Sequence, residues 1–188
     1  MFLSSLFRPS KLKADARTIY DAAVSQARTP DFYAQRSVPD TVDSRFDMIV
    51  LHVWLVLAHI RKAPDALQRQ SGKLGQAIFD YMILDFDRNV RQIGISDVRV
   101  GKHMKAMAKA FYGRLDAYDT AIEAATLEDA LKRNVFGKVD IDLETLDIQS
   151  KFLADYVRKQ ADFLGEQGYE PLLDGKIAFL GEIVKKSR

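Results

Sequence analysis

Apolar residues along this chain recur at the three- and four-residue spacing of amphipathic helices. Leu12, Ile19, Ala23 and Val24, for example, lie on one face of a predicted helix over residues 11–28. We find no convincing two-residue alternation typical of a half-buried strand, and no internal repeat. The pattern therefore predicts an all-α fold.

Capping residues, prolines and glycines divide the chain into about six helices. Thr41 or Asp43 caps the second predicted helix, Pro64 starts the third, Gly94 ends it and Thr126 opens the fifth. The predicted helices cover about residues 11–28, 41–61, 64–93, 98–124, 126–136 and, after an acidic connection, a stretch ending near 164. The remaining residues form either irregular chain or a final short helix.

These elements predict a single-domain helical bundle over residues 11–188, preceded by a basic and apolar N-terminal tail over residues 1–10. In that tail the first basic residue follows four apolar ones, Phe2, Leu3, Leu6 and Phe7. Three interpretations stay open: a frayed end, a helix packed on the bundle, or an interfacial membrane anchor.

The second predicted helix is apolar nearly all round, which indicates a central position in the bundle. Its apolar stretch, Met48–Ile60, is shorter than the roughly 20 residues that a membrane-spanning helix needs. His52 and His59 interrupt this stretch seven positions apart, so they point roughly the same way. They are either core or boundary histidines hydrogen-bonded to neighbouring groups, or a metal or haem pair.

Composition narrows the function classes further. The 188 residues include no cysteine, which excludes disulfides, thiolate zinc sites, iron–sulfur clusters and cysteine nucleophiles. Absence of cysteine also fits a reducing compartment. A net charge of +2, from 28 Lys and Arg against 26 Asp and Glu, is too balanced for a binder that works through a basic tail.

Common catalytic motifs are missing from the sequence. There is no GxxxxGK[ST] or GxGxxG phosphate loop, no HExxH or GxSxG, and no Glu-x-x-His pair for a di-iron centre. His103 lies in a basic stretch and is interpreted as a surface residue. We therefore expect a protein that is not an enzyme and that carries no metal and no cofactor.

The fourth predicted helix carries the clearest charge pattern. Arg99, Lys102, Lys105 and Lys109 fall within a sector of about 120° when read at 100° per residue. The apolar residues of the opposite side are Val100, Met104, Met107, Phe111 and Leu115. The basic side is either a solvated helix face or a docking face for phosphate groups, anionic lipid or an acidic partner. An RNA- or ribosome-binding helical module is therefore one hypothesis.

Four blocks of the sequence resemble the ubiquinol–cytochrome c chaperone family. The blocks are ARTPDFY running into VPDTVDSRFDMIVLH (Ala27–His52), Asp85-Phe86-Asp87 with Arg91, GISDVRVGKHMKAM (Gly94–Met107) and AFYGRLDAYDTAI (Ala110–Ile122). They follow the order and spacing of the family. Gln92 stands where the family has an acidic residue, and Ser44 replaces its common glycine.

The resemblance implies an all-helical, non-enzymatic chaperone that binds newly made cytochrome b during assembly of respiratory complex III. It also implies a second small assembly protein and the ribosome as further partners. The chain resembles a bacterial member of the family, since it has no long transit peptide. We expect it in the cytoplasm, with peripheral contact to the anionic inner face of the inner membrane.

Residues within these blocks are the candidate partner-binding residues. Phe32 and Tyr33 lie in a proline-flanked segment, which predicts an exposed docking loop. Phe111 and Tyr112 are interpreted as core or boundary residues, and Tyr112 is also a candidate for partner contact. The charged candidates, which either form ion pairs that fix the packing or contact a partner directly, are Arg45, Asp47, Asp85, Asp87 and Arg91.

Overall fold

The structure, a computed structural model, describes residues 10–92, 96–137 and 139–181, and helices are its only regular elements there. The helices are α1 (Lys11–Ala27), α2 (Pro30–Gln35), α3 (Val42–Arg61), α4 (Asp65–Gln92), α5 (Asp97–Glu123), α6 (Leu127–Asn134), α7 (Leu143–Glu166) and α8 (Glu170–Leu173). This confirms the all-α, single-domain prediction. The six predicted helices correspond to α1 and α3 to α7, and α2 and α8 are short additions.

Helix starts coincide with residues that favour them. The Thr41 side chain accepts a hydrogen bond from the Ser44 N–H (3.2 Å) at the start of α3. Asp142 accepts one from the Thr145 N–H (2.8 Å) at the start of α7, and this bond lowers the pKa of the Asp142 carboxyl. Pro30 begins α2, where its missing N–H costs nothing. The local sequence therefore sets where these elements begin.

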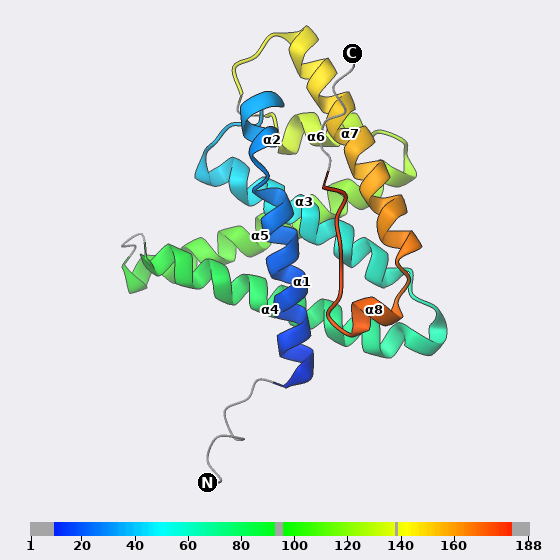
Figure 1. Ribbon diagram of the computed structural model, residues 1–188. Coiled ribbons are helices and arrows are strands. Elements are labelled where there is room, and N and C mark those ends of the chain that lie inside the picture. The colour runs from blue at the N-terminus through cyan, green and yellow to red at the C-terminus, as the bar shows by residue number, and fades with distance from the viewer. Residues whose placement is uncertain (1–9, 93–95, 138, 182–188) are drawn as a thin grey trace.

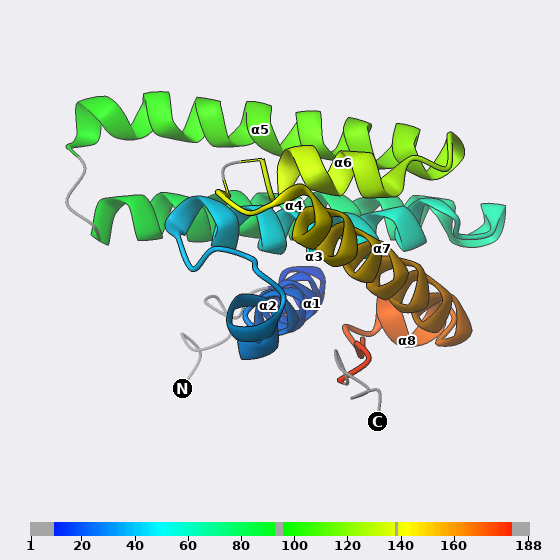
Figure 2. The same cartoon turned by 90° about the horizontal axis from the view of Figure 1, so that it is seen from above.

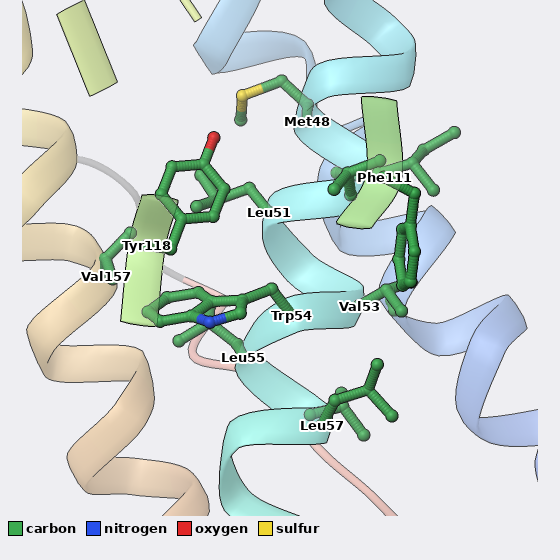
Figure 3. Packing of buried hydrophobic residues seen from close by; sticks show 14 of the residues in the cluster. Met48, Leu51, Val53, Trp54, Leu55, Leu57, Phe111, Tyr118 and Val157 are labelled. Atoms are coloured by element: carbon green, nitrogen blue, oxygen red, sulfur yellow. The ribbon is translucent and has the colours of Figure 1, made fainter. Parts of the chain in front are cut away.

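Helix α3 is the centre of the bundle. It packs against α1, α4, α5 and α7, and its side chains from residue 47 to 57 are all buried. Figure 3 shows Tyr118 and Val157 beside Trp54 on one side of α3, and Phe111 beside Val53 on the other. The apolar character of α3 all round is thus explained by neighbours on every side.

The remaining helices form layers about α3. Viewed from above, α5 lies on one side of α3 and α4, and α1 and α7 lie on the other (Figure 2). Among the described residues, no helix combines the length and apolar character that a bilayer crossing requires.

Some expectations fall outside the described residues. Residues 1–9 of the predicted tail are among them, and so are Ile93 and Gly94, where the third predicted helix was expected to end. The division into a tail over residues 1–10 and a domain over residues 11–188 therefore stays a prediction.

Candidate functional site

The outer face of α5 carries a row of exposed cations. We call Arg99, Lys102, Lys105 and Lys109 the basic face. In the described part of the chain, no acidic side chain forms an ion pair with any of these four. The opposite side of α5 packs inward as the spacing predicts, with Val100 and Phe111 buried. The basic face is thus exposed to solvent, and none of its cations is paired with an acidic side chain that the structure describes.

An exposed aromatic ring continues this face. Tyr112 is 56% exposed and lies one helical turn beyond Lys109. Its ring contacts Phe79 of α4 and its own neighbour Phe111, with ring centroids 5.3 and 5.4 Å apart. Of the two residues interpreted as core or boundary, Phe111 is buried and Tyr112 is at the surface. Exposed aromatic residues such as this one are enriched at protein interfaces.

Helices α4 and α5 form a hairpin that carries the basic face. They pack side by side along their length, and the end where α4 meets α5 projects beyond the rest of the bundle (Figure 1). Arg99 and Lys102 lie in the first two turns of α5, near that end. A partner surface therefore has open access to them.

The expectation that Phe32 lies on an exposed loop is wrong. Phe32 belongs to the short helix α2 and is fully buried, with its ring edge-on to Tyr156 (centroids 5.1 Å apart) and to His52 (5.8 Å). The physical reason is that Pro30 starts a helical turn, and this turn directs the next large apolar side chain into the core. Tyr33 is half-buried, and its hydroxyl donates to the Ala27 carbonyl (2.8 Å).

Tyr33 and Arg45 meet at one surface depression. This cavity has a volume of about 460 Å³ and is lined by Arg28, Pro30, Tyr33, Ala34, Asp40 and Arg45. The Arg45 guanidinium donates to both carboxylate oxygens of Asp40 (2.6 and 3.1 Å), which lowers the pKa of Asp40. Burial raises the pKa of Tyr33 to about 12, so its hydroxyl stays protonated.

Two of the charged candidates join helices in the interior. Asp47 of α3 forms an ion pair with Arg114 of α5, and the Arg114 guanidinium also lies 5.2 Å from the centre of the Phe46 ring. Asp85 of α4 accepts a hydrogen bond from the Tyr20 hydroxyl of α1 (2.9 Å). Both contacts support the interpretation that these carboxylates fix the packing.

The other charged pair runs along the surface of α4. Arg91 Nε donates to Asp87 Oδ2 (2.8 Å) across one helical turn. Asp87 and Arg91, which belong to the same sequence block, are thus in contact in the structure. Direct partner contact by Arg45, Asp87 and Arg91 stays a prediction.

The two apolar-helix histidines are core residues. The Met48 carbonyl can only accept, so the bond between it and His52 Nδ1 (2.8 Å) puts the proton on Nδ1. Nε2 then accepts from the Tyr156 hydroxyl (2.7 Å), and burial lowers the pKa of His52 to about 4. His59 stacks on Tyr169 with ring centroids 4.6 Å apart, and burial lowers its pKa. His103 is exposed, as expected.

These contacts leave no ring nitrogen of His52 free for iron, so the haem hypothesis loses its first candidate ligand. Across the residues that the structure describes, no three His, Asp or Glu side chains gather as a metal site would require.

Sequence reasoning missed three glutamines that hold the C-terminal part of the chain. Gln26 of α1, Gln160 of α7 and Gln167 at the C-cap of α7 hydrogen-bond to backbone groups beyond residue 177. The sequence did contain a sign of this role for Gln160, which lies between Val157 and Leu164 on the buried side of α7. A polar residue at a core position must find hydrogen-bond partners.

Comparison with known proteins identifies the family. The family described as "Ubiquinol-cytochrome C chaperone" matches residues 34–179, which is most of the chain. The chain belongs to this family. The resemblance drawn from the four sequence blocks is therefore confirmed.

Individual members of the ubiquinol–cytochrome c chaperone family show the extent of the likeness. Ubiquinol-cytochrome-c reductase complex assembly factor 1 of Xenopus laevis is 30% identical over 176 residues, which are 90% of this chain and 82% of the frog protein. The human protein of that name is 29% identical over 173 residues. The chain covers 55% of the human protein, about half its length.

A solved structure of the family has the same fold. The Cbp3 homolog from Brucella abortus superposes with a TM-score of 0.76 at 33% identity. The match covers 97% of this chain and 98% of the Brucella chain. The helical arrangement around α3 is therefore shared along nearly the whole length of both.

Proposed function

We propose that this chain is a non-enzymatic chaperone that binds newly synthesised cytochrome b during assembly of the ubiquinol–cytochrome c reductase complex. Membership of the ubiquinol–cytochrome c chaperone family supports the chaperone role, and the names of the relatives support the complex. Cytochrome b is the client that the sequence resemblance implies.

The observation that carries this proposal is the basic face of α5 with Tyr112 at its end. A membrane-protein client is made at an anionic lipid surface, where each well-placed Lys or Arg contributes about 1 kcal/mol to attraction. In our proposal the basic face holds the chaperone peripherally at the inner face of the inner membrane. The aromatic patch of Phe79 and Tyr112 then covers apolar client surface.

The second small assembly protein and the ribosome are further proposed partners. The depression lined by Tyr33 and Arg45 suits such a contact, because it offers an aromatic ring and a guanidinium at the surface.

The test is affinity capture of the chaperone during active synthesis. We expect cytochrome b among the co-purifying proteins, and deletion of the gene should lower both assembled complex and spectroscopic cytochrome b. Lys102→Glu with Lys105→Glu should reduce the capture. Lys151→Glu with Lys159→Glu, an equal charge change at exposed positions of α7, is the matched control. Normal cytochrome b and assembled complex in the deletion strain would refute the proposal.

The same basic face favours one rival, an RNA- or ribosome-binding module. Phosphate contacts by lysines predict an affinity that falls steeply with salt concentration. The measurement is binding of labelled RNA at low and physiological salt, with the natural chain and the Lys102→Glu, Lys105→Glu variant. RNA binding that the variant loses would favour the rival, whereas no binding at low salt would exclude it.

A further inference from the structure

The last described segment of the chain lies between two helices without forming one itself. We call Lys176–Gly181 the strap. It leaves α8 and runs between α1 and α7, as the red trace in Figure 1 shows. Its sequence, KIAFLG, is mostly apolar.

Two glutamines, Gln160 of α7 and Gln167 at the C-cap of α7, bind the strap through its main chain. The Gln167 amide donates to the Ala178 carbonyl (2.9 Å) and accepts from the Ala178 N–H (2.8 Å). The Gln160 amide makes the same pair of bonds with Leu180, at 3.1 and 3.0 Å. Each glutamine thus satisfies one donor and one acceptor of a strap residue, as a neighbouring β-strand would.

The spacing of these contacts is that of an extended peptide. Gln160 of α7 and Gln167, the C-cap of that helix, are seven residues apart, whereas the two strap residues that they bind are two apart. Gln26 of α1 donates to the Leu180 carbonyl from the opposite wall (3.0 Å). The strap is therefore held at every second residue, from one side at Ala178 and from both sides at Leu180.

The intervening strap residues fill apolar space. Ile177 and Phe179 are partly buried against the core, and the Phe179 ring lies edge-on to His52 with centroids 5.8 Å apart. The Ala178 side chain is exposed. Main-chain hydrogen bonds with pockets for alternate side chains are the recognition mode of proteins that bind extended segments.

We propose that the groove between α1 and α7 is a binding site for an extended apolar segment of an unfolded polypeptide, and that the strap is its displaceable internal occupant. The glutamines hydrogen-bond only to backbone N–H and C=O groups, so segments of differing sequence can bind in the groove. Gln160 is fully buried, and its amide needs an occupant in the groove to satisfy it. That the natural occupant is a segment of the client rests on the proposed function.

The strap is suited to leave its groove. Beyond Lys176, whose N–H donates to the Pro171 carbonyl of α8 (2.9 Å), the strap belongs to no helix, and the printed hydrogen bonds that hold it come from side-chain amides. Segments of this kind open locally without unfolding of the core. Release would expose Tyr156 and the Phe179 pocket while α3 stays covered by its other neighbours.

The test compares strap variants that leave the groove unchanged. Ala178→Pro removes the N–H that Gln167 accepts, and Ala178→Ser keeps it as the matched control. The probe is a fluorescein-labelled peptide of sequence DGKIAFLG, residues 174–181. We expect the Ala178→Pro chain to bind this peptide about tenfold more tightly than the natural and Ala178→Ser chains. Adding Gln167→Ala should reverse the gain, and a peptide with proline at the Leu180 position should bind weakly to every chain.

Two results would overturn the inference. One is equal binding of the peptide by the natural and Ala178→Pro chains. The other is amide exchange at Ala178 and Leu180 of the natural chain that is as slow as in the core of α3, which would make the strap a permanent part of the fold. Because the peptide is synthetic, this outcome is independent of cytochrome b capture, and either proposal can fail while the other stands.

Discussion

His52, Tyr156 and Gln26 form a chain of hydrogen bonds through the interior. The Tyr156 hydroxyl donates to His52 Nε2 and accepts from the Gln26 amide (3.0 Å), so each polar group has a partner. A proton added to His52 would fall on Nε2, where the donor hydroxyl already lies. Burial and this arrangement together keep the imidazole neutral in the folded protein.

This neutral histidine predicts an acid-sensitive fold. The pKa of His52 is about 4 when folded and 6.5 when unfolded, so between these values the unfolded chain binds the extra proton. The stabilisation is fully present above the unfolded pKa and is lost as pH falls toward the folded one. Urea unfolding should show a loss of about 2 kcal/mol in the free energy of unfolding between about pH 7.5 and 5.

His52→Gln is the control for this prediction. Carboxyls with lowered pKa, such as Asp40 and Asp142, affect stability only below their unfolded values of 3.8, outside this range. His59 also has a lowered pKa, so it too makes stability fall on acidification, and it does so equally in the natural chain and in His52→Gln. If His52→Gln and the natural chain lose equal stability on acidification, His52 is not the responsible group.

Sequence reasoning succeeded for the histidines and failed for Phe32. A histidine among apolar residues of a central helix has few outcomes other than a hydrogen-bonded core position, which His52 takes. A segment flanked by prolines fits a loop as well as a short helix start, and only packing on Tyr156 decides between them. The pairing of Gln160 with the strap depends on tertiary contacts that no local pattern contains.

Single contacts fix how neighbouring helices are packed. The Asp47–Arg114 pair joins α3 to α5, and a hydrogen bond from Trp54 Nε1 to Asp119 Oδ1 (2.7 Å) joins the same two helices two turns further along. Arg61 also donates to Asp119 (2.6 Å). Polar contacts at two levels therefore fix the register of α5 along α3.

Asp47→Asn tests the first of these levels. Removing one charge of a largely buried pair leaves the other uncompensated, so we expect a loss of about 3 kcal/mol in the free energy of unfolding. Asp40→Asn breaks the exposed pair with Arg45 and should cost far less, because solvent screens that pair. Denaturant titration of both variants gives the comparison, and equal losses would contradict the structural role of Asp47.

The turn after α8 depends on a glycine. Gly175 has φ +74°, and a Cβ there would lie 2.9 Å from Asp15 Cα of α1. Gly175→Ala should destabilise the fold by about 2 kcal/mol, because the new methyl adds strain at this φ and overlaps α1. Gly165→Ala, in open space on α7, should be neutral or stabilising. Thermal unfolding measures both, and equal melting temperatures would show that the turn tolerates the methyl.

Element boundaries were predictable where capping chemistry marks them. Thr41 and Pro64 mark the starts of α3 and α4, and the amphipathic spacing of α5 correctly separates its buried and exposed sides. The helices α2 and α8 are too short to give a periodic signal. For α8, sequence reasoning left irregular chain and a short helix open.

Across the whole molecule, the residues that hold the fold and the residues proposed to bind partners are largely separate. The interior contacts gather around α3, whereas the residues of the basic face are exposed on α5. The all-round apolar pattern of α3 was enough to predict its central place. The layer order of the other helices was not predictable, because helical spacing says which side is buried and not against which neighbour.

This separation predicts that charge reversal on the basic face spares the fold. Lys102→Glu with Lys105→Glu removes no ion pair among the described residues, so the free energy of unfolding should change by less than about 1 kcal/mol. Denaturant unfolding of this variant is the measurement. A larger loss would mean that reduced capture of cytochrome b reports misfolding and not binding.

The central place of α3 also bears on how the chain is made. Its cover includes Phe111 of α5 and Val157 of α7, so the most apolar segment is synthesised well before the residues that enclose it. At translation rates of 5 to 20 residues per second, the last cover arrives roughly 5 to 20 seconds after the segment itself. During that interval the apolar side chains of α3 lack part of their cover in the nascent chain.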